Sequence, residues 1–257
     1  MTLPTITREN YHSPEVAQAS LSCSQVKAWS ECPAAAHARY VLGENRDEPT
    51  EAMLLGSYLD EILLSGDRAA FEAENEKAIF TRTGTLRAGF ARINDMVARC
   101  KADPAFMAMI TGEHQVIMQG VIAGQPMRIM IDALPSEIPA IVDLKKMAQT
   151  DKLKWSDTEG QRVDFWKTYG YHWQSAIYRE IYRQNTGDDL PFVLAVVEAE
   201  PPHQLFGQPI AIDCLHEVEA VVDRITQIKA GAEPDRCGKC QWCKKTSKFE
   251  LREPAYI

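Results

Sequence analysis

The sequence predicts an α/β protein in which helices flank a central sheet and a cysteine-rich segment follows. Apolar residues recur at helical spacing in residues 51–64 and again in residues 165–185. Residues 114–147, between these two segments, are rich in Val and Ile and are punctuated by Gly and Pro, which is typical of successive strands. Three cysteines then occur close together near the end of the chain.

The length and composition favour one large domain with a small appendage. A chain of 257 residues with 45% hydrophobic content has enough apolar residues for a sizeable core. We expect an N-terminal arm over residues 1–20, which are polar and contain two prolines, a main domain over 21–231 and a tail over 232–257. No segment approaches the roughly 20 apolar residues that span a bilayer. No basic start precedes an apolar run either, so we expect a cytoplasmic protein without a membrane partner.

The charge distribution leaves two interpretations open. The formal net charge of -8 argues mildly against a protein that coats nucleic acid non-specifically, because phosphate contacts need clustered Lys and Arg. Basic residues nevertheless gather in two segments, which form either a basic track for nucleic acid or ordinary solvated surface. They are Lys145, Lys146, Lys152 and Lys154 in one segment, and Arg236, Lys239, Lys244, Lys245, Lys248 and Arg252 in the other.

The first half of the chain predicts helices. Residues 24–42 predict two short helices separated at Cys32-Pro33, because proline suits the first turn of the second helix. Residues 51–64 predict a buried helix that a Ser-Gly-Asp sequence ends. Another helix is expected over residues 85–101.

The second half predicts the sheet and the helices that cover it. Three successive strands are expected within residues 114–147, a buried strand at 191–200 and a short strand at 204–211. The helix expected over 165–185 carries Tyr171, Gln174, Tyr178 and Ile181 along one stripe. A last helix is expected over 213–230, before the cysteine-rich tail.

The sequence MIDALPSEIPAIVDLKK predicts a hairpin that carries two carboxylates. If Leu134 pairs with Ile141, Asp132 lies directly opposite Asp143 on one face of an antiparallel ladder. The alternation of side chains along a strand places Lys145 on the same face.

Two carboxylates in this position repel each other unless a cation lies between them. Mg²⁺ prefers oxygen ligands and keeps several waters, which leaves room for a phosphate oxygen and an attacking water. Lys145 is placed to orient that water or to balance charge in the transition state. The alternative is an exposed hairpin flanked by two aspartates, with Lys145 as an ordinary surface charge.

Four separated elements resemble the PD-(D/E)xK nuclease superfamily, in the branch of RecE-like phage exonucleases and RecB-like nuclease domains. The opening LSCSQVKAWSECPAAAHARYVLG and the helix LLGSYLDEILL resemble the first two elements of that branch. IDALPSEIPAIVDLKK resembles its strand-turn-strand core, and YHWQSAIY resembles the helix that follows. Together they span about residues 21–180, in the order of the family.

This resemblance implies a restriction-endonuclease-like fold, with a mixed central sheet flanked by helices, and hydrolysis of DNA that depends on Mg²⁺ or Mn²⁺. It implies that Asp132 and Asp143 bind the metal and that Lys145 assists the nucleophile. Gln174 and Tyr178, four residues apart on one helical face, would point toward the site or the DNA backbone. Packing of that face into the core is the alternative, above all for Tyr178.

Two further carboxylates are candidates by the same resemblance. Asp60 stands where the branch usually has a histidine metal ligand, and an oxygen ligand there suits a hard metal ion. Glu113 stands at about the position of an upstream acidic residue of many family members, and its alternative is a surface carboxylate.

The spacing of Cys237, Cys240 and Cys243 allows a loop to wrap around one metal or cluster. The resemblance supplies Cys32 as the fourth ligand and implies a [4Fe-4S] cluster that staples the tail to the N-terminal helix. Zn²⁺ bound by four thiolates is the alternative metal, and three reduced surface thiols are the alternative without one. The other cysteines, Cys23, Cys100 and Cys214, are expected to be small buried residues.

Two functions of different classes follow from the resemblance. The first is an exodeoxyribonuclease that processes double-stranded DNA ends in phage-type recombination, as a homo-oligomer and with a single-strand annealing protein as a possible partner. The second is a non-catalytic protein that keeps the fold and binds DNA ends or acts as an adaptor.

Overall fold

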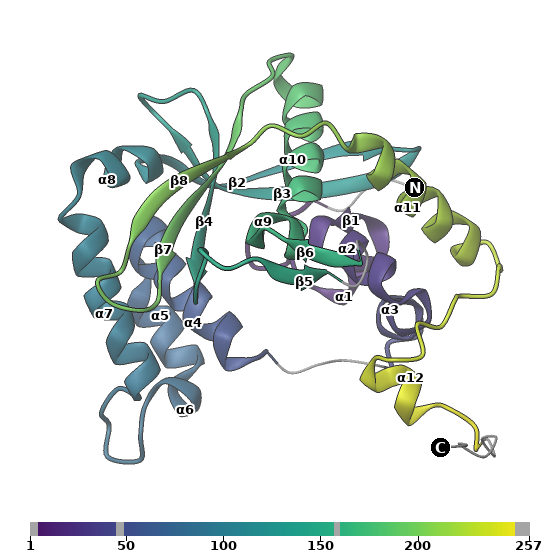
Figure 1. The fold of residues 1–257 in the computed structure, drawn as a ribbon, viewed down its shortest axis with the longest axis horizontal. Coiled ribbons are helices and arrows are strands. Elements are labelled where there is room, and N and C mark those ends of the chain that lie inside the picture. The colour runs from purple at the N-terminus through teal and green to yellow at the C-terminus, as the bar shows by residue number, and fades with distance from the viewer. Residues whose placement is uncertain (1–4, 45–48, 157–159, 250–257) are drawn as a thin grey trace.

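The protein has an α/β fold around a mixed sheet, as Figure 1 shows. The computed structural model describes residues 5–44, 49–156 and 160–249, and Arg252 lies outside them. Helices pack on both faces of the sheet. The cysteines of the C-terminal segment pack next to α3 (Pro33–Tyr40). The predicted fold class is therefore confirmed.

In the part of the chain that the structure describes, six strands form the central sheet and two form a small separate sheet. The central strands are β1 (Leu21–Ser22), β2 (Gly112–Ile122), β3 (Gln125–Pro135), β4 (Ile141–Met147), β7 (Phe192–Glu198) and β8 (Leu205–Ile210). The separate pair is β5 (Lys154–Ser156) and β6 (Gln161–Val163). The order in the central sheet is β1-β3-β4-β7-β8, and β2 pairs with β3.

The remaining helices divide between the N-terminal half and the C-terminal half. Those before the sheet are α1 (Pro14–Ala19), α2 (Cys23–Glu31), α4 (Glu51–Asp60), the π-helical turn η1 (Glu61–Ser65), α5 (Arg68–Glu74), α6 (Glu76–Ile79), α7 (Ala88–Lys101) and α8 (Pro104–Ile110). Those after the hairpin are α9 (Phe165–Thr168), α10 (Tyr171–Thr186), α11 (Leu215–Lys229) and α12 (Gln241–Lys245).

Among the described residues, strand β3 pairs with three strands, two of which lie along the same edge. β2 pairs with β3 along most of its length, from Gly112 opposite Pro135 to Ile122 opposite Gln125. Because β2 takes one edge, β1 and β4 share the other edge at different heights. β1 pairs beside Met127 and Arg128, and β4 pairs beside Ala133. Residues 129–132 on this edge therefore lie between two partner strands.

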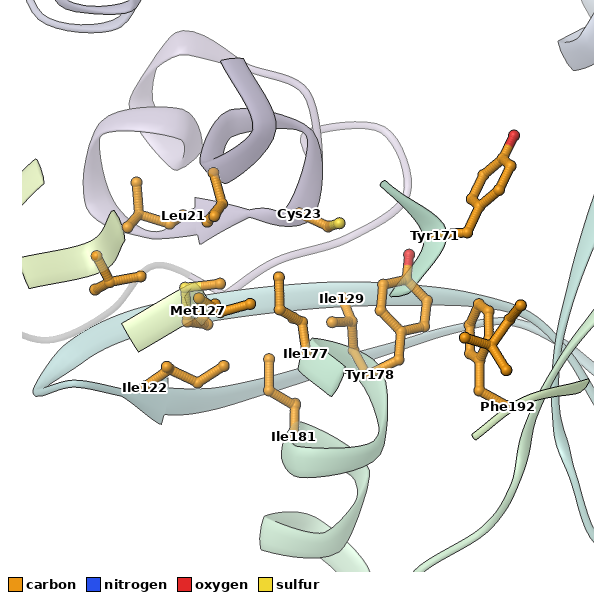
Figure 2. Packing of buried hydrophobic residues seen from close by; sticks show 14 of the residues in the cluster. Leu21, Cys23, Ile122, Met127, Ile129, Tyr171, Ile177, Tyr178, Ile181 and Phe192 are labelled. Carbon is orange, nitrogen blue, oxygen red and sulfur yellow. The ribbon is translucent and has the colours of Figure 1, made fainter. Parts of the chain in front are cut away.

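Each face of the sheet has its own apolar core. One core contains side chains of α2, α10 and α11, and Figure 2 shows Ile177, Tyr178 and Ile181 of α10 against Ile129 of β3. The other core contains side chains of α4, α7 and α8 together with those of β4 and β7 that alternate with the first set. This alternation is the pattern expected of strands buried on both faces.

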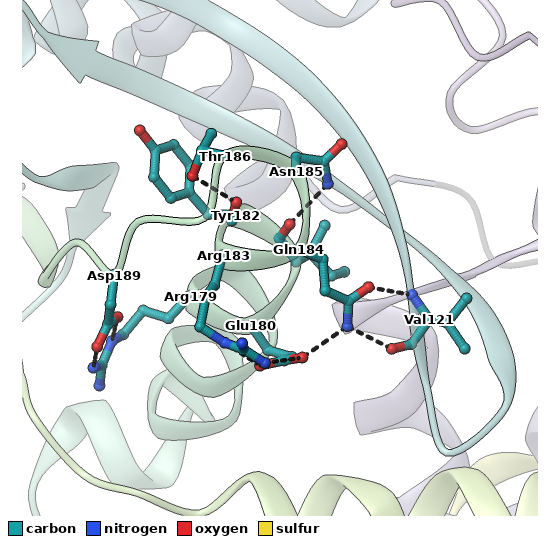
Figure 3. A network of polar contacts seen from close by, with 10 residues as sticks. Val121, Arg179, Glu180, Tyr182, Arg183, Gln184, Asn185, Thr186 and Asp189 are labelled. Atoms are coloured by element: carbon teal, nitrogen blue, oxygen red, sulfur yellow. Dashed lines mark hydrogen bonds and ion pairs between the residues drawn. The ribbon is translucent and has the colours of Figure 1, made fainter.

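Polar contacts hold the C-terminal half of α10 against the rest of the domain (Figure 3). The Gln184 side chain accepts from the Val121 N–H at 2.8 Å and donates to the Val121 carbonyl at 2.7 Å. Arg179 forms two hydrogen bonds with Asp189 in the loop before β7. These contacts fix the helix across the sheet, so that its first turns lie over β3 and β4.

The segment expected to be an N-terminal arm instead packs on the sheet. Tyr11 and Val16 are buried, and α1 begins at Pro14. The buried guanidinium of Arg128 donates to the main-chain carbonyls of Tyr11 and Val16 at 3.2 and 3.4 Å, and to that of Ser20. A buried guanidinium needs several acceptors, and this segment provides them, so the expected arm is corrected to an ordered part of the domain over the residues described.

The other differences are additions to the expected elements. The helix expected over 51–64 is present as α4, but it ends in the π-helical turn η1. Helices α5, α6 and α8 and the pair β5–β6 were not expected from the sequence. The two short helices separated at Cys32-Pro33 are confirmed as α2 and α3. None of the helices described is long and apolar enough to cross a membrane.

Candidate active site

Asp132 and Asp143 lie at the point where β3 and β4 separate. In the described residues these strands pair at Ala133 and Val142, which is the predicted register with Asp132 opposite Asp143. Beyond that pair, Asp132 Oδ2 accepts the backbone N–H of Leu144 at 2.9 Å. A side-chain oxygen thus takes the place of a ladder carbonyl.

Lys145 contacts both carboxylates. Its Nζ lies 2.6 Å from Asp143 Oδ2 and 3.7 Å from Asp132 Oδ2, and it donates to the Leu144 carbonyl at 3.0 Å. Burial alone would lower the pKa of Lys145, but the charges of Asp143 and Asp132 raise it well above its usual range. The ammonium therefore stays charged and supplies positive charge between the two acids.

One lysine does not fully offset the repulsion of the carboxylates. Burial and the charge of Asp143 raise the pKa of Asp132 to about 7, although Lys145 and the Leu144 N–H act in the opposite direction. The pair accordingly favours an additional cation, or a proton, near neutral pH.

Gln174 of α10 fixes the orientation of Asp143. Its Nε2 donates to Asp143 Oδ1 at 2.6 Å, and its own Oε1 accepts from Lys27 Nζ at 3.4 Å. Both Gln174 and Asp143 are buried. The amide is therefore held with its donor toward the carboxylate by a cation on its other side.

Tyr178, one turn further along α10, has its hydrogen bond to the main chain and not to the carboxylates. Its hydroxyl donates to the Met130 carbonyl at 3.1 Å, in the segment of β3 that lies between β1 and β4. This contact satisfies a main-chain acceptor where the ladder is interrupted. A direct role of Tyr178 at the carboxylates stays a prediction.

The other two candidate carboxylates differ in position. Asp60 ends α4 and lies close enough to the pair that burial and the charge of Asp132 raise its pKa well above the usual range. Glu113 is exposed on β2 opposite Leu134. Within the described residues, Asp60, Asp132 and Asp143 do not bring their oxygens together within 4.8 Å. Asp60 is thus a neighbour of the pair, and metal binding by it or by Glu113 stays a prediction.

Sequence reasoning missed Lys27 as a neighbour of the site. Lys27 holds Gln174 and also lies 5.1 Å from the centre of the Tyr171 ring. The available signal was the capping sequence Ser22-x-x-Gln25, which fixes the start of α2 and hence the face that carries Lys27. Nothing in the sequence distinguishes Lys27 from a surface lysine.

The donor set fits a hard divalent cation. Asp143 Oδ2 is buried and has no hydrogen bond among the described residues, because the Lys145 ammonium approaches it outside hydrogen-bond geometry. The other oxygen of Asp143 is held by Gln174. Carboxylate oxygens are the ligands that Mg²⁺ and Mn²⁺ prefer, and an ion bound here would share Asp143 Oδ2 with the Lys145 ammonium.

Four cysteines form a second candidate site at the end of the domain. The sulfur atoms of Cys32, Cys237, Cys240 and Cys243 all lie within 4.8 Å of one another. Cys32 lies at the start of α3 and the other three surround the start of α12, so the tail packs against the N-terminal region. The remaining three cysteines are buried, as expected.

The family model for a PDDEXK-like domain of unknown function (DUF3799) matches residues 22–246. The chain belongs to this family. The resemblance to the PD-(D/E)xK superfamily is thereby confirmed, and the matched range of this PDDEXK-like domain includes Asp132, Asp143, Lys145 and all four clustered cysteines.

Solved structures include a similar protein over nearly the whole PDDEXK-like chain. A 2.19 Å crystal structure of a "putative exonuclease" from Eubacterium rectale has 34% sequence identity and a TM-score of 0.88, covering 98% of this chain and 97% of that one. A structure of SSO0001 covers 89% of this chain and 96% of that one with 10% identity and a TM-score of 0.36, which shows nothing further. The search of curated proteins finds no match.

Proposed function

We propose that this PDDEXK-like protein is a metal-dependent DNA nuclease, specifically an exodeoxyribonuclease acting on double-stranded ends. The observation that carries the proposal is the pair of opposed carboxylates, Asp132 and Asp143, with Lys145 in contact with both and one buried oxygen of Asp143 without a hydrogen bond. The name of the similar protein from Eubacterium rectale supports the exonuclease assignment.

Each residue of the site has its own role in the proposed hydrolysis. Asp132 and Asp143 would hold Mg²⁺ or Mn²⁺, with Asp60 as a further acidic neighbour. Such an ion supplies charge that polarises a phosphodiester oxygen and acidifies a water molecule. Gln174 would fix the orientation of Asp143 for the ion by holding Oδ1. Lys145, held in its charged form, offsets negative charge that develops on the phosphate as water adds to phosphorus and the P–O bond to the leaving nucleotide breaks.

The resemblance to the PD-(D/E)xK superfamily also supports a proposal for the substrate, the location, the oligomeric state and the partner of the enzyme. We propose DNA ends in phage-type recombination as the substrate, a cytoplasmic location, a homo-oligomer as the active form, and a single-strand annealing protein as a partner. The basic segments beside the hairpin, which include the exposed Lys152, and in the tail, which include the exposed Lys244 and Lys245, support contact with the phosphate backbone.

Digestion of linear and circular duplexes of the same sequence tests this proposal. The linear duplex carries a label at one end, and wild type is compared with Asp143→Ala in Mg²⁺ and in Mn²⁺. We expect wild type to shorten the linear duplex progressively and leave the closed circle intact, and Asp143→Ala to lose at least about 100-fold in rate.

Three outcomes contradict parts of the proposal. Equal rates for wild type and Asp143→Ala would remove the carboxylate pair from the reaction. Cleavage of the circle would retain the nuclease but remove the dependence on ends. Binding of ends by wild type without any cleavage in either metal would favour the non-catalytic end-binding alternative.

A further inference from the structure

The four clustered sulfur atoms have a spacing that identifies the kind of metal they suit. Cys32 Sγ lies 3.6 Å from Cys243 Sγ and 3.7 Å from Cys240 Sγ, and Cys237 Sγ lies 3.9 Å from Cys243 Sγ. A disulfide needs about 2.05 Å between the sulfurs, so none of these three pairs is bonded. All four sulfurs nevertheless converge on one point, since every pair lies within 4.8 Å.

These sulfur–sulfur distances are those expected when four thiolates bind one ion in tetrahedral geometry. Zinc binds thiolate sulfur at about 2.3 Å, and a regular tetrahedron of that radius has edges of about 3.8 Å. The three sulfur–sulfur separations in the structure differ from this edge by 0.2 Å or less. A [4Fe-4S] cluster does not fit as well, because each thiolate then binds a different iron and four irons and four sulfides lie between the thiolates. The ligands would have to stand further apart than these cysteines do.

We propose that Cys32, Cys237, Cys240 and Cys243 bind one Zn²⁺ ion in a closed tetrahedral site. The structure thus favours the zinc alternative over the iron-sulfur cluster that the resemblance implies. Each protonated thiol gives up its proton to solvent as its sulfur binds the ion. With four protein ligands the site has no open position for water, so it is a structural site and takes no part in hydrolysis.

The main-chain geometry around the sulfurs supports a thiolate site. The N–H of Cys240 points to Cys237 Sγ and the N–H of Cys243 to Cys240 Sγ, each at 3.4 Å. Arg236 donates to the Cys243 carbonyl at 2.9 Å and to the Thr246 hydroxyl at 2.7 Å, which fixes the turn of α12. Donors directed at the ligands and at the ligand loop stabilise negatively charged sulfur and hold its orientation.

The ion would join two segments that are far apart in the sequence. Cys32 directly precedes α3, and the Ala34 N–H in the first turn of this helix donates to the Asp235 carbonyl at 3.0 Å. Residues 231–240 contain no helix or strand, so the metal would hold in place a stretch without secondary structure of its own. Like a long-range cross-link, it restricts the unfolded chain and stabilises the folded one.

Metal analysis of the full-length protein tests the proposal without depending on nuclease activity. The chain is expressed in medium supplemented with both iron and zinc, and it is purified anaerobically without metal-affinity chromatography. We expect one zinc per chain, no iron, and no absorbance near 400 nm. Iron in any stoichiometry, absorbance near 400 nm, or the absence of bound metal would overturn the proposal.

Two variants locate the ion. Cys240→Ser removes a half-buried ligand and should lose the zinc and lower the melting temperature. Cys214→Ser is the matched control, because Cys214 lies outside the group and its thiol donates to the His172 carbonyl at 3.4 Å, which a hydroxyl can also do. Cys214→Ser should keep one zinc per chain. Retention of zinc by a folded Cys240→Ser would place the metal elsewhere.

Cobalt exchange keeps the proposal testable if Cys240→Ser fails to fold. Co²⁺ replacing Zn²⁺ in the wild-type protein should give the intense visible bands of tetrahedral cobalt and sulfur-to-cobalt charge transfer, at one equivalent. Weak bands of an octahedral ion, or failure to take up cobalt, would contradict a closed four-thiolate site.

Discussion

Gln174 Nε2 lies 2.6 Å from Asp143 Oδ1, which joins helix α10 to the hairpin that carries the acidic pair. Both side chains are buried, and a lysine from α2 holds the other end of the amide. Three elements far apart in the sequence therefore determine how one carboxylate points. In the proposed function the metal would share the second oxygen of Asp143 with the Lys145 ammonium, which lies 2.6 Å from it.

Gln174→Ala should weaken both metal binding and hydrolysis by about 10- to 100-fold, because residues that orient metal ligands typically contribute this much. Gln184→Ala is the matched control, since Gln184 lies on the same helix and contacts Val121 instead of a carboxylate. Calorimetric titration with Mn²⁺ and rates on linear DNA measure the two effects. An equal loss of Mn²⁺ binding and of rate in both variants would mean that these properties depend on the packing of the helix and not on the Gln174 amide.

Lys145→Ala should separate chemistry from metal binding. Removing a group that offsets transition-state charge costs about 10²- to 10³-fold in rate, whereas removing a cation next to the carboxylates should leave Mn²⁺ affinity unchanged or increase it. Lys146→Ala, one residue along β4, is the control. A Lys145→Ala protein that no longer binds Mn²⁺ would show that the lysine organises the site instead.

The stability of the metal-free protein should fall as the pH rises from about 4 to 7. The folded state holds the proton of Asp132 with a pKa of about 7, whereas an aspartate in an unfolded chain titrates near 3.9. Over this interval the folded state binds more protons than the unfolded state, so the free energy of unfolding decreases with pH. Thermal unfolding at pH 5.5 and pH 7.5 measures this difference.

Asp132→Asn should flatten that pH dependence, and the exposed Asp188→Asn should leave it unchanged. Mg²⁺ should raise the melting temperature of wild type more at pH 7.5 than at pH 5.5, because the protonated carboxyl is a poor ligand. An identical pH dependence in wild type and Asp132→Asn would contradict this description of the pair.

Tyr178→Phe should reduce stability more than catalysis. The lost hydrogen bond to the Met130 carbonyl costs about 1 kcal/mol of the free energy of unfolding, or somewhat more because the acceptor is left without a partner. We expect the rate on linear DNA to stay within about threefold of wild type. A 100-fold fall in rate with unchanged stability would assign Tyr178 to the reaction itself.

The sequence was sufficient for the hairpin register because two constraints coincide there. Alternation along each strand sets which side chains share a face, and the short turn between Pro135 and Ile141 sets which residues face each other. Asp132, Asp143 and Lys145 could therefore be placed together without any tertiary information. The helix stripe carrying Gln174 and Tyr178 was likewise predictable from its spacing.

Contacts between distant segments could not be predicted in this way. The position of Lys27 depends on how α2 packs against α10, and the packing of Tyr11 depends on a buried arginine more than 100 residues later in the chain. Gln174 forms a hydrogen bond to a carboxylate and Tyr178 to a main-chain carbonyl. This difference depends on where β4 and β1 pair along β3. The sulfur spacings that favour zinc over a cluster are also a product of the folded structure alone.

The central claim is that Asp132 and Asp143 together bind a divalent cation. Calorimetric titration of Mn²⁺ into the protein without DNA, comparing wild type with Asp132→Asn/Asp143→Asn, tests it most directly. We predict that wild type binds the ion and that the double variant, still folded, loses this binding by at least about 100-fold. Undiminished Mn²⁺ binding by the double variant would contradict the claim.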